Sequence, residues 1–205
     1  AGDVNGDGFS DVIISALYGG SNAGEVYIYF GGSPMNNVAD ISILGENSGD
    51  NFGKSVSNAG DMNGDSYDDF IVGASSYSSG SGKTYIYFGG SNINTFADLI
   101  ITGQSGDYLG QSVSDAGDVN SDGFSDVIVS TGIAVNGKVY LYYGGQTLSS
   151  QPDVTFYSES SSLYFGSSIS GINDINSDGY DDIIIGALGY STNTGKAYIY
   201  FGGNV

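Results

Sequence analysis

The sequence predicts an all-β fold, a β-propeller made of four-stranded blades, and two observations carry this prediction. The segment Val26–Gly32 returns at Thr84–Gly90, Val139–Gly145 and Ala197–Gly203, with spacings of 55 to 58 residues. Each repeat also holds four short segments that are rich in Val, Ile, Tyr and Phe and are bounded by Gly, Asn, Asp and Ser, which is typical of strands. Four strands in a unit of this length indicate a propeller blade.

The four strand segments follow the same order in each unit. In the second unit they are Phe52–Ser57, Asp69–Ala74, Thr84–Gly90 and Ala97–Thr102. The third segment has apolar side chains at consecutive positions, as in Tyr27–Phe30, so both of its faces must be covered. A blade that is stacked between two others supplies this cover. No window of 11 residues has an apolar period of 3.6, so we expect no helices.

We expect one repeat domain over residues 1–205, with approximate units 1–51, 52–108, 109–164 and 165–205. The first unit lacks its first strand, because Ala1-Gly2-Asp3 corresponds to Ala59-Gly60-Asp61, and the last unit lacks its fourth strand. About 3.6 blades are therefore present. We expect a partial propeller whose open ends are covered by further blades of a longer chain or by a second copy.

Composition excludes several classes of function. The chain has no His, no Cys and no Arg, and four Lys stand against 23 acidic residues, for a net charge of −19. Without a basic patch, nucleic acid is excluded as a partner. Without His or Cys, the chain can form neither a Ser-His-Asp or Cys-His catalytic group nor an ordinary zinc site. No apolar run reaches 18 residues, so we expect no membrane span.

An acidic loop, Asp-x-Asn-x-Asp-x-(Phe/Tyr)-x-Asp, lies between the first and second strand segments of every unit. Its successive copies consist of Asp3, Asn5, Asp7, Phe9 and Asp11; Asp61, Asn63, Asp65, Tyr67 and Asp69; Asp118, Asn120, Asp122, Phe124 and Asp126; and Asp174, Asn176, Asp178, Tyr180 and Asp182. Side-chain oxygens at positions 1, 3, 5 and 9, with the main-chain carbonyl at position 7, provide the oxygen ligands that Ca²⁺ prefers. We therefore expect about four Ca²⁺ per chain.

Two other interpretations of these loops are weaker. An EF-hand needs a Glu at position 12, which is Ile14, Val72, Val129 or Ile185 here. Asp, Asn and Gly are also ordinary turn residues, but four loops with the same three Asp and one Asn favour a metal site. Crowded carboxylates would repel one another without a cation. Position 6 requires a positive φ and is Gly in three loops but Ser66 in the second, so that site is expected to be weaker.

The repeats resemble FG-GAP repeats, the blades of the integrin α-subunit propeller and of many bacterial and archaeal surface proteins. The Phe-Gly segments are Phe52-Gly53 and Phe165-Gly166, with Leu109-Gly110 in the third unit, and Gly73-Ala74 and Gly186-Ala187 match Gly-Ala-Pro without its Pro. The resemblance implies that all four acidic loops bind calcium and that the protein is an extracellular or cell-surface scaffold for adhesion or assembly. Propellers of this family usually have seven blades, more than this chain supplies.

Three functions remain to be weighed. We expect a non-enzymatic, calcium-stabilised scaffold that binds a protein or glycan ligand on a cell surface. The alternative is a self-assembling subunit of a surface layer or filament, completed by strands of neighbouring chains. A carbohydrate-active enzyme is less favoured, because no carboxylate outside the loops recurs in all units; its candidates are Asp68, Asp181, Glu25, Glu46 and Glu159.

Two further sets of residues recur at equivalent positions. Lys83, Lys138 and Lys196, with Glu25 in the first unit, are expected to be solvated at a strand start or to pair with acids across a contact between chains. Most tyrosines occupy repeated strand positions and are expected to pack between blades. The better ligand-binding candidates lie after the second strand: Tyr18, Tyr77 and Tyr190.

Overall fold

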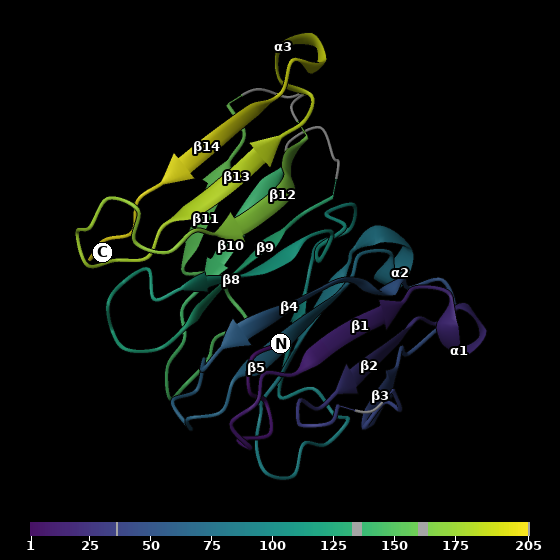
Figure 1. The fold of residues 1–205 in the computed structure, drawn as a ribbon. Coiled ribbons are helices and arrows are strands. Elements are labelled where there is room, and N and C mark those ends of the chain that lie inside the picture. Colours follow the sequence, from purple (N-terminus) through teal and green to yellow (C-terminus); the bar gives the residue numbers. More distant parts are fainter. Residues whose placement is uncertain (36, 133–136, 160–163, 205) are drawn as a thin grey trace.

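The computed structural model describes residues 1–35, 37–132, 137–159 and 164–204, and it arranges them in four antiparallel sheets (Figure 1). The first sheet contains β1 (Val12–Ala16), β2 (Glu25–Tyr29) and β3 (Ile41–Leu44). The second contains β4 (Phe52–Gly60), β5 (Asp69–Ala74), β6 (Lys83–Tyr87) and β7 (Leu99–Thr102). The third contains β8 (Val113–Gly117), β9 (Asp126–Ser130), β10 (Lys138–Tyr142) and β11 (Val154–Tyr157). The fourth contains β12 (Phe165–Gly171), β13 (Ile183–Ala187) and β14 (Lys196–Tyr200).

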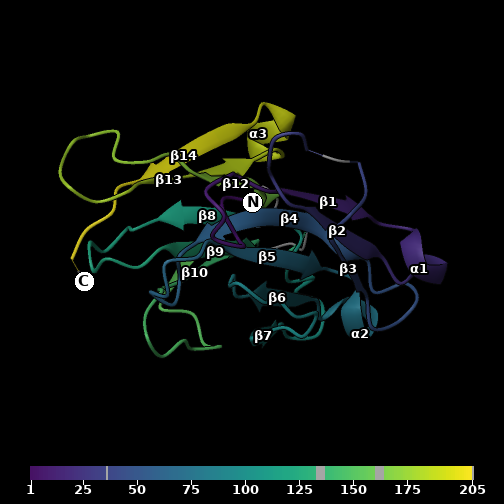
Figure 2. The ribbon, with the colours of Figure 1, turned by 60° about the horizontal axis from the view of Figure 1, so that its bottom comes forward.

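Each sheet is a meander in which neighbouring strands follow one another in the chain. In the described residues, the first and fourth sheets have three strands and the middle two have four. The strands β1, β4, β8 and β12 lie at one edge of their sheets and contact one another in that order, so the sheets fan out from them as blades (Figure 2). The all-β propeller predicted from the repeats is therefore confirmed as a partial propeller.

The hydrophobic core lies between blades, because the alternating side chains of a strand point to opposite neighbours. In β5, Phe70 and Val72 belong to the cluster shared with the first blade, whereas Ile71 belongs to the cluster shared with the third. In β6, all five residues are buried, so the consecutive apolar positions of the third strand are explained by cover on both faces. A third cluster lies between the third and fourth blades.

The outer faces of the two end blades are less covered. Val12 and Ile14 of β1 are 40% and 48% exposed, although the equivalent Phe70 and Val72 are fully buried. At the other end, Ile199 of β14 is 49% exposed, whereas the equivalent Ile86 is fully buried. The end blades therefore expose apolar side chains that the interior blades bury.

The expectation of no helical structure was wrong in one detail. Each of three loops after a second strand contains a four-residue helical turn: α1 (Gly19–Asn22), α2 (Tyr77–Gly80) and α3 (Tyr190–Asn193). Left-handed residues interrupt the first two, for example Gly20 at φ 55° and Ser78 at φ 49°. They are tight turns that polar residues and glycine permit, and too short for the apolar periodicity of a helix to appear.

Candidate metal centres

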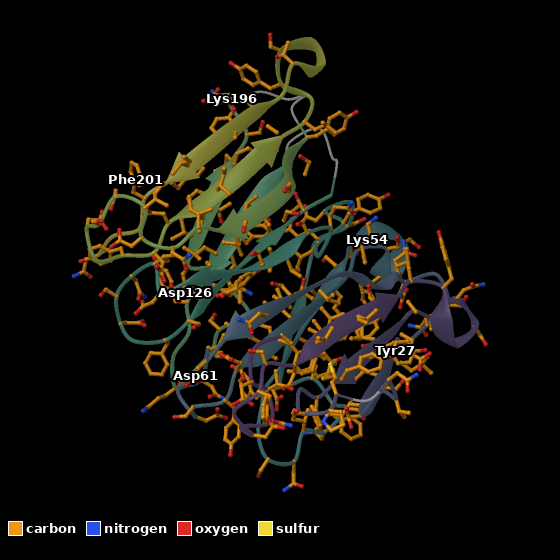
Figure 3. All side chains as sticks on the ribbon, viewed as in Figure 1. Tyr27, Lys54, Asp61, Asp126, Lys196 and Phe201 are labelled. Carbon is orange, nitrogen blue, oxygen red and sulfur yellow. The ribbon has the colours of Figure 1, made fainter. Side chains whose placement is uncertain are left out.

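All four acidic loops connect the first and second strand positions of their blades, so the propeller geometry places them along one rim. Figure 3 shows Asp61 and Asp126 on this side of the molecule, with Lys54 at the other end of the strands. Asp61 directly follows β4, and Asp69 begins β5. The repeat of the sequence thus becomes a row of loops in space.

The first three acidic positions of each loop are joined by hydrogen bonds. In the first loop, Oδ1 of Asp3 accepts N–H groups of Gly6 and Asp7 at 2.8 and 3.0 Å, and Oδ2 accepts that of Gly8 at 2.8 Å. The Nδ2 group of Asn5 donates to Oδ2 of Asp7 at 3.0 Å. The other three loops contain the same bonds with at most one missing. These bonds curl the chain around the side-chain oxygens of positions 1, 3 and 5.

The last aspartate of each loop is buried, and its carboxylate accepts hydrogen bonds from main-chain N–H groups. Asp69 and Asp126 are fully buried, and Oδ2 of Asp126 accepts the N–H of Val119 at 2.9 Å, while Oδ1 accepts that of Gly144 at 2.8 Å. The equivalent bonds recur for the other three copies: Asp11, Asp69 and Asp182. Burial raises the pKa of Asp69 and of Asp126 to about 7. Two donated hydrogen bonds oppose this shift, and the carboxylates of each loop add to it.

The donor chemistry of the loops fits calcium. Each loop offers carboxylate and amide oxygens, and an ionised carboxylate has about four lone-pair sites, so an oxygen that accepts one N–H can still bind a cation. Within the described ranges, no three acidic side chains already converge as a complete metal centre. Positions 1, 3 and 5 are gathered by hydrogen bonds within the loop, and position 9 is held by main-chain N–H groups.

Two positions in each loop adopt positive φ. At position 6, Gly8, Gly123 and Gly179 have φ of 89° to 93°, and Ser66 has φ 73°, as the sequence predicts. The sequence did not indicate that position 4 also has a positive φ. This position is Gly6 or Gly64 in two loops and Ser121 or Ser177 in the others, where φ is 59° and 62°. A residue with a side chain is strained in the left-handed conformation, so the loops that contain these serines have a less favourable main-chain energy.

Ser66→Gly is expected to stabilise the chain by about 0.5–1 kcal/mol. The change removes left-handed strain of about 1–2 kcal/mol, and the greater freedom of glycine in the unfolded chain offsets part of that gain. Chemical denaturation in EGTA measures the effect. Gly123→Ser is the matched reverse change, and an equal shift in the same direction for both variants would contradict the explanation.

Neighbouring loops are tied together across the blades. Oδ2 of Asp68 accepts the N–H of Asp3 at 2.7 Å, and Oδ2 of Asp181 accepts that of Asp118 at 2.9 Å. Main-chain bonds repeat this link, including Ser125 N–H to the carbonyl of Asp61 at 3.0 Å. These contacts were not foreseen from the sequence, although the residue before the last Asp recurs as Asp68 and Asp181. The first three loops thus contribute to the interface with the next blade.

The aromatic residue at position 7 also reaches the preceding blade. The ring of Tyr67 lies over Gly6, where an added Cβ would come within 2.4 Å of Cε1, and the ring of Phe124 lies over Gly64 in the same way. The sequence suggested only a carbonyl ligand at this position. In addition, the aromatic side chain at this position packs over the acidic loop of the preceding blade.

The recurring lysines lie on the opposite rim and pair within the chain. Lys83 is only 7% exposed, and its Nζ lies 2.8 Å from Oε1 of Glu46 and 3.8 Å from the ring centroid of Tyr77. Lys196 pairs with Glu159 at 3.0 Å, and Lys138 lies 3.8 Å from Asp107. The acidic partners belong to the connections between blades. The expectation of a solvated strand start is therefore wrong for Lys83, since Glu46 and Tyr77 enclose its ammonium group.

Glu46→Gln is expected to destabilise the chain by about 1–2 kcal/mol, because it leaves the ammonium group of Lys83 largely buried without its carboxylate. Glu159→Gln is the matched control, since the side chains of Lys196 and Glu159 are 34% and 55% exposed and ion pairs near the surface contribute at most about 1 kcal/mol. Urea denaturation of both variants gives the comparison. Equal destabilisation would contradict the role of burial.

The remaining carboxylates that were considered for catalysis have structural partners. Glu25 accepts a hydrogen bond from Tyr27 at 2.7 Å and another from the hydroxyl of Ser42. Glu46 and Glu159 hold lysines, and Asp68 and Asp181 hold main-chain N–H groups of the preceding loop. These contacts account for all five side chains.

The fold and the loops define a β-propeller with acidic loops between the first two strands of each blade. The FG-GAP repeat model matches residues 1–29, 52–87 and 165–200. The chain belongs to the FG-GAP repeat family, with blades of the integrin α type.

Integrin α subunits are similar to almost the whole chain. Integrin alpha-5 of Xenopus laevis is 30% identical over 209 residues, which cover 93% of this chain and 19% of that protein. Integrin alpha-8 of Gallus gallus is 28% identical over 221 residues, covering 98% and 20%. Integrin alpha-7 of Homo sapiens is 30% identical over 175 residues, covering 82% and 15%. The chain thus spans a fifth or less of the length of these relatives. In the described part of the chain, no helix has the length and apolar character to cross a membrane.

Proposed function

We propose that the chain is a calcium-stabilised, extracellular propeller scaffold that acts in cell-surface adhesion and has no catalytic activity of its own. The observation that carries the proposal is the row of four acidic loops, the first three of which are hydrogen-bonded to the next blade. A cation held in one loop would stabilise both that loop and an interface between blades. Four bound Ca²⁺ would change the formal charge from −19 to −11.

The proposed extracellular location is consistent with this role for calcium. External calcium is millimolar and can fill sites with dissociation constants of 10⁻⁴–10⁻³ M, as extracellular modules have. Similarity to integrin α subunits supports adhesion, and a protein or glycan on a cell surface is the proposed ligand. The rest of a longer parent chain would supply any further blades.

Calcium-dependent adhesion can be measured directly with coated beads. Beads that carry the chain are expected to be retained under flow on a panel of immobilised extracellular glycans and glycoproteins in 2 mM calcium, about the extracellular level. EGTA should release them. Retention no greater than that of albumin-coated beads would contradict an adhesive role, whether or not calcium binds.

Self-assembly is the second candidate, and the exposed end faces favour it. In the interior, Ile71 and Ile86 of one blade pack against Val127, Val129 and Tyr142 of the next. The last blade presents Ile199 at the position of Ile86, and the first presents Val12 and Ile14 on its outer face. The two ends are therefore the two halves of one interface, and a head-to-tail contact of this type forms rings or filaments.

Sedimentation velocity distinguishes this candidate from the first. Assembly predicts dimers or larger species that Ile199→Asp, on one end face, abolishes. Ser150→Asp adds the same charge at an exposed position of the third blade, in the connection between β10 and β11 and away from both end faces, and is the control. A monomer at all concentrations would exclude self-assembly and leave the scaffold proposal intact.

A further inference from the structure

The rim opposite the acidic loops contains a cavity of about 540 Å³ between the second and third blades. Its lining includes Lys54 near the start of β4, Ser75 and Ser76 after β5, Asn51, Tyr108 and Gln111. Figure 3 shows Lys54 beside the α2 turn, away from Asp61 and Asp126. Lys54 and Asp61 are seven positions apart, which in an extended strand corresponds to about 23 Å. This cavity is therefore separate from the proposed calcium sites.

Lys54 gives the cavity a positive charge that its own surroundings do not neutralise. The other three lysines form ion pairs with Glu46, Asp107 and Glu159, whereas no ion pair among the described residues involves Lys54. The cavity lining contains no carboxylate. The distant acidic loops are screened, because the Debye length is about 8 Å at physiological salt.

Tyr108 provides a fixed aromatic wall. Its ring atoms lie close to the main chain of Gly80, where an added Cβ would come within 2.6 Å of Cζ, and its Cβ lies against Gly132. The residue has φ 51°, and 43% of it is exposed. Since the side chain packs closely against the main chain at Gly80 and Gly132, an incoming ligand meets a preformed surface.

The other lining groups are hydroxyls and amides. The Nδ2 group of Asn51 donates to Oγ of Ser76 at 2.7 Å, which fixes both side chains and leaves the second amide hydrogen for another acceptor. Gln111 and Ser75 add further polar groups. A cation, a fixed ring and several neutral donors and acceptors together match a sugar that carries a carboxylate: the ring stacks on the sugar face, and the amides and hydroxyls bind its hydroxyls.

We propose that this cavity binds a hexuronic acid residue of an acidic glycan, with its carboxylate on Lys54 and its sugar ring on Tyr108. A peptide carboxylate fits less well, because the lining comes from loops and strand ends and offers no strand edge for main-chain pairing. The inference deepens the proposed adhesive function by naming the class of its ligand. The inference rests on that proposed function and on the folded blades, and the experiment measures folding and calcium binding separately.

The test is a titration of the ¹⁵N-labelled chain in calcium with methyl β-D-glucuronide and with the uncharged methyl β-D-glucoside. For a ligand of this size we expect a dissociation constant of about 1 mM for the glucuronide. Lys54→Gln, which introduces the residue that the equivalent position Gln111 carries, should weaken glucuronide binding about five- to tenfold and leave glucoside binding unchanged. Lys196→Gln removes the same charge elsewhere and should change neither.

Tyr108→Asn tests the aromatic wall. The equivalent Asn51 has φ 59°, so asparagine should accept the same left-handed main chain. Both sugars should bind at least about fivefold more weakly to this variant, because stacking does not depend on the carboxylate.

Three results would overturn the inference. The first is no binding of glucuronide by a chain that binds calcium and unfolds cooperatively. The second is an equal effect of Lys54→Gln and Lys196→Gln. The third is binding of N-acetyl-aspartate amide as tight as that of glucuronide and unaffected by Tyr108→Asn, which would assign the cavity to peptides. Calcium binding and the thermal midpoint are measured on the same samples, so failure of this inference is distinguishable from failure of the scaffold proposal.

Discussion

Removal of calcium with EGTA is expected to lower the thermal midpoint of the chain by about 20 °C or more. For sites with a dissociation constant of about 10⁻⁴ M, roughly 10 mM calcium is a hundredfold excess and stabilises the folded state by about 2.7 kcal/mol per site. In a domain of this size, 1 kcal/mol corresponds to about 2–4 °C, so one loop accounts for roughly 5–10 °C. Differential scanning calorimetry in calcium and in EGTA measures the difference.

The double variant Asp65→Ala, Asp122→Ala tests whether the acidic loops cause this difference in thermal midpoint. It removes the position 5 carboxylate from two of the four loops, so the difference between calcium and EGTA should fall to about half. Both side chains are exposed and bond only within their loops, so little change is expected in EGTA. Glu159→Gln removes an acid outside the loops and should keep the full difference. A full difference in the double variant would contradict the assignment.

Asp126→Ala is expected to destabilise the chain by about 3–5 kcal/mol even without calcium. The change leaves the N–H groups of Val119 and Gly144 without their acceptor, and an unsatisfied buried group costs about 1–3 kcal/mol. The thermal midpoint in EGTA should therefore fall by roughly 10 °C. This aspartate has a structural role in addition to its proposed role as a ligand.

Asp122→Ala is the comparison, because it lies in the same loop but is exposed. In EGTA it should change the free energy of unfolding by no more than about 0.5 kcal/mol. Asp126→Asn keeps one acceptor oxygen, so its free energy of unfolding should fall by about half as much as that of Asp126→Ala. If Asp126→Ala and Asp122→Ala were equally stable in EGTA, the buried carboxylate would not hold the main chain as described.

The repeat made most of the fold predictable. Strand segments such as Asp69–Ala74 and Ala97–Thr102 recur with the same spacing, and sheets of three or four strands follow from them. The third unit differs from this pattern: Leu109-Gly110 corresponds to Phe52-Gly53 at the start of β4, but β8 begins only at Val113. Leu109 instead forms a parallel bridge with Gly82 of the preceding blade. This contact depends on tertiary packing, which strand propensity does not encode.

The candidate site was predictable in its residue types and less so in its contacts. The sequence could show that Asp126 lies at position 9, but not that both of its oxygens face main-chain N–H groups, since Gly144 is 18 residues away. The hydrogen bond that the N–H of Asp3 donates to Asp68 spans 65 residues and depends on how two blades stack. Tyr108 was not singled out either, because its exposure and its contacts with Gly80 and Gly132 arise only in the fold.

Native mass spectrometry in calcium-containing buffer tests the central claim most directly, because one spectrum counts both metal ions and chains. The account predicts about four Ca²⁺ per chain, falling to about two in the Asp65→Ala, Asp122→Ala variant, with Mg²⁺ as a poor substitute. The mass also shows whether the chain is a monomer or an assembly. A folded chain that binds no calcium would contradict the account.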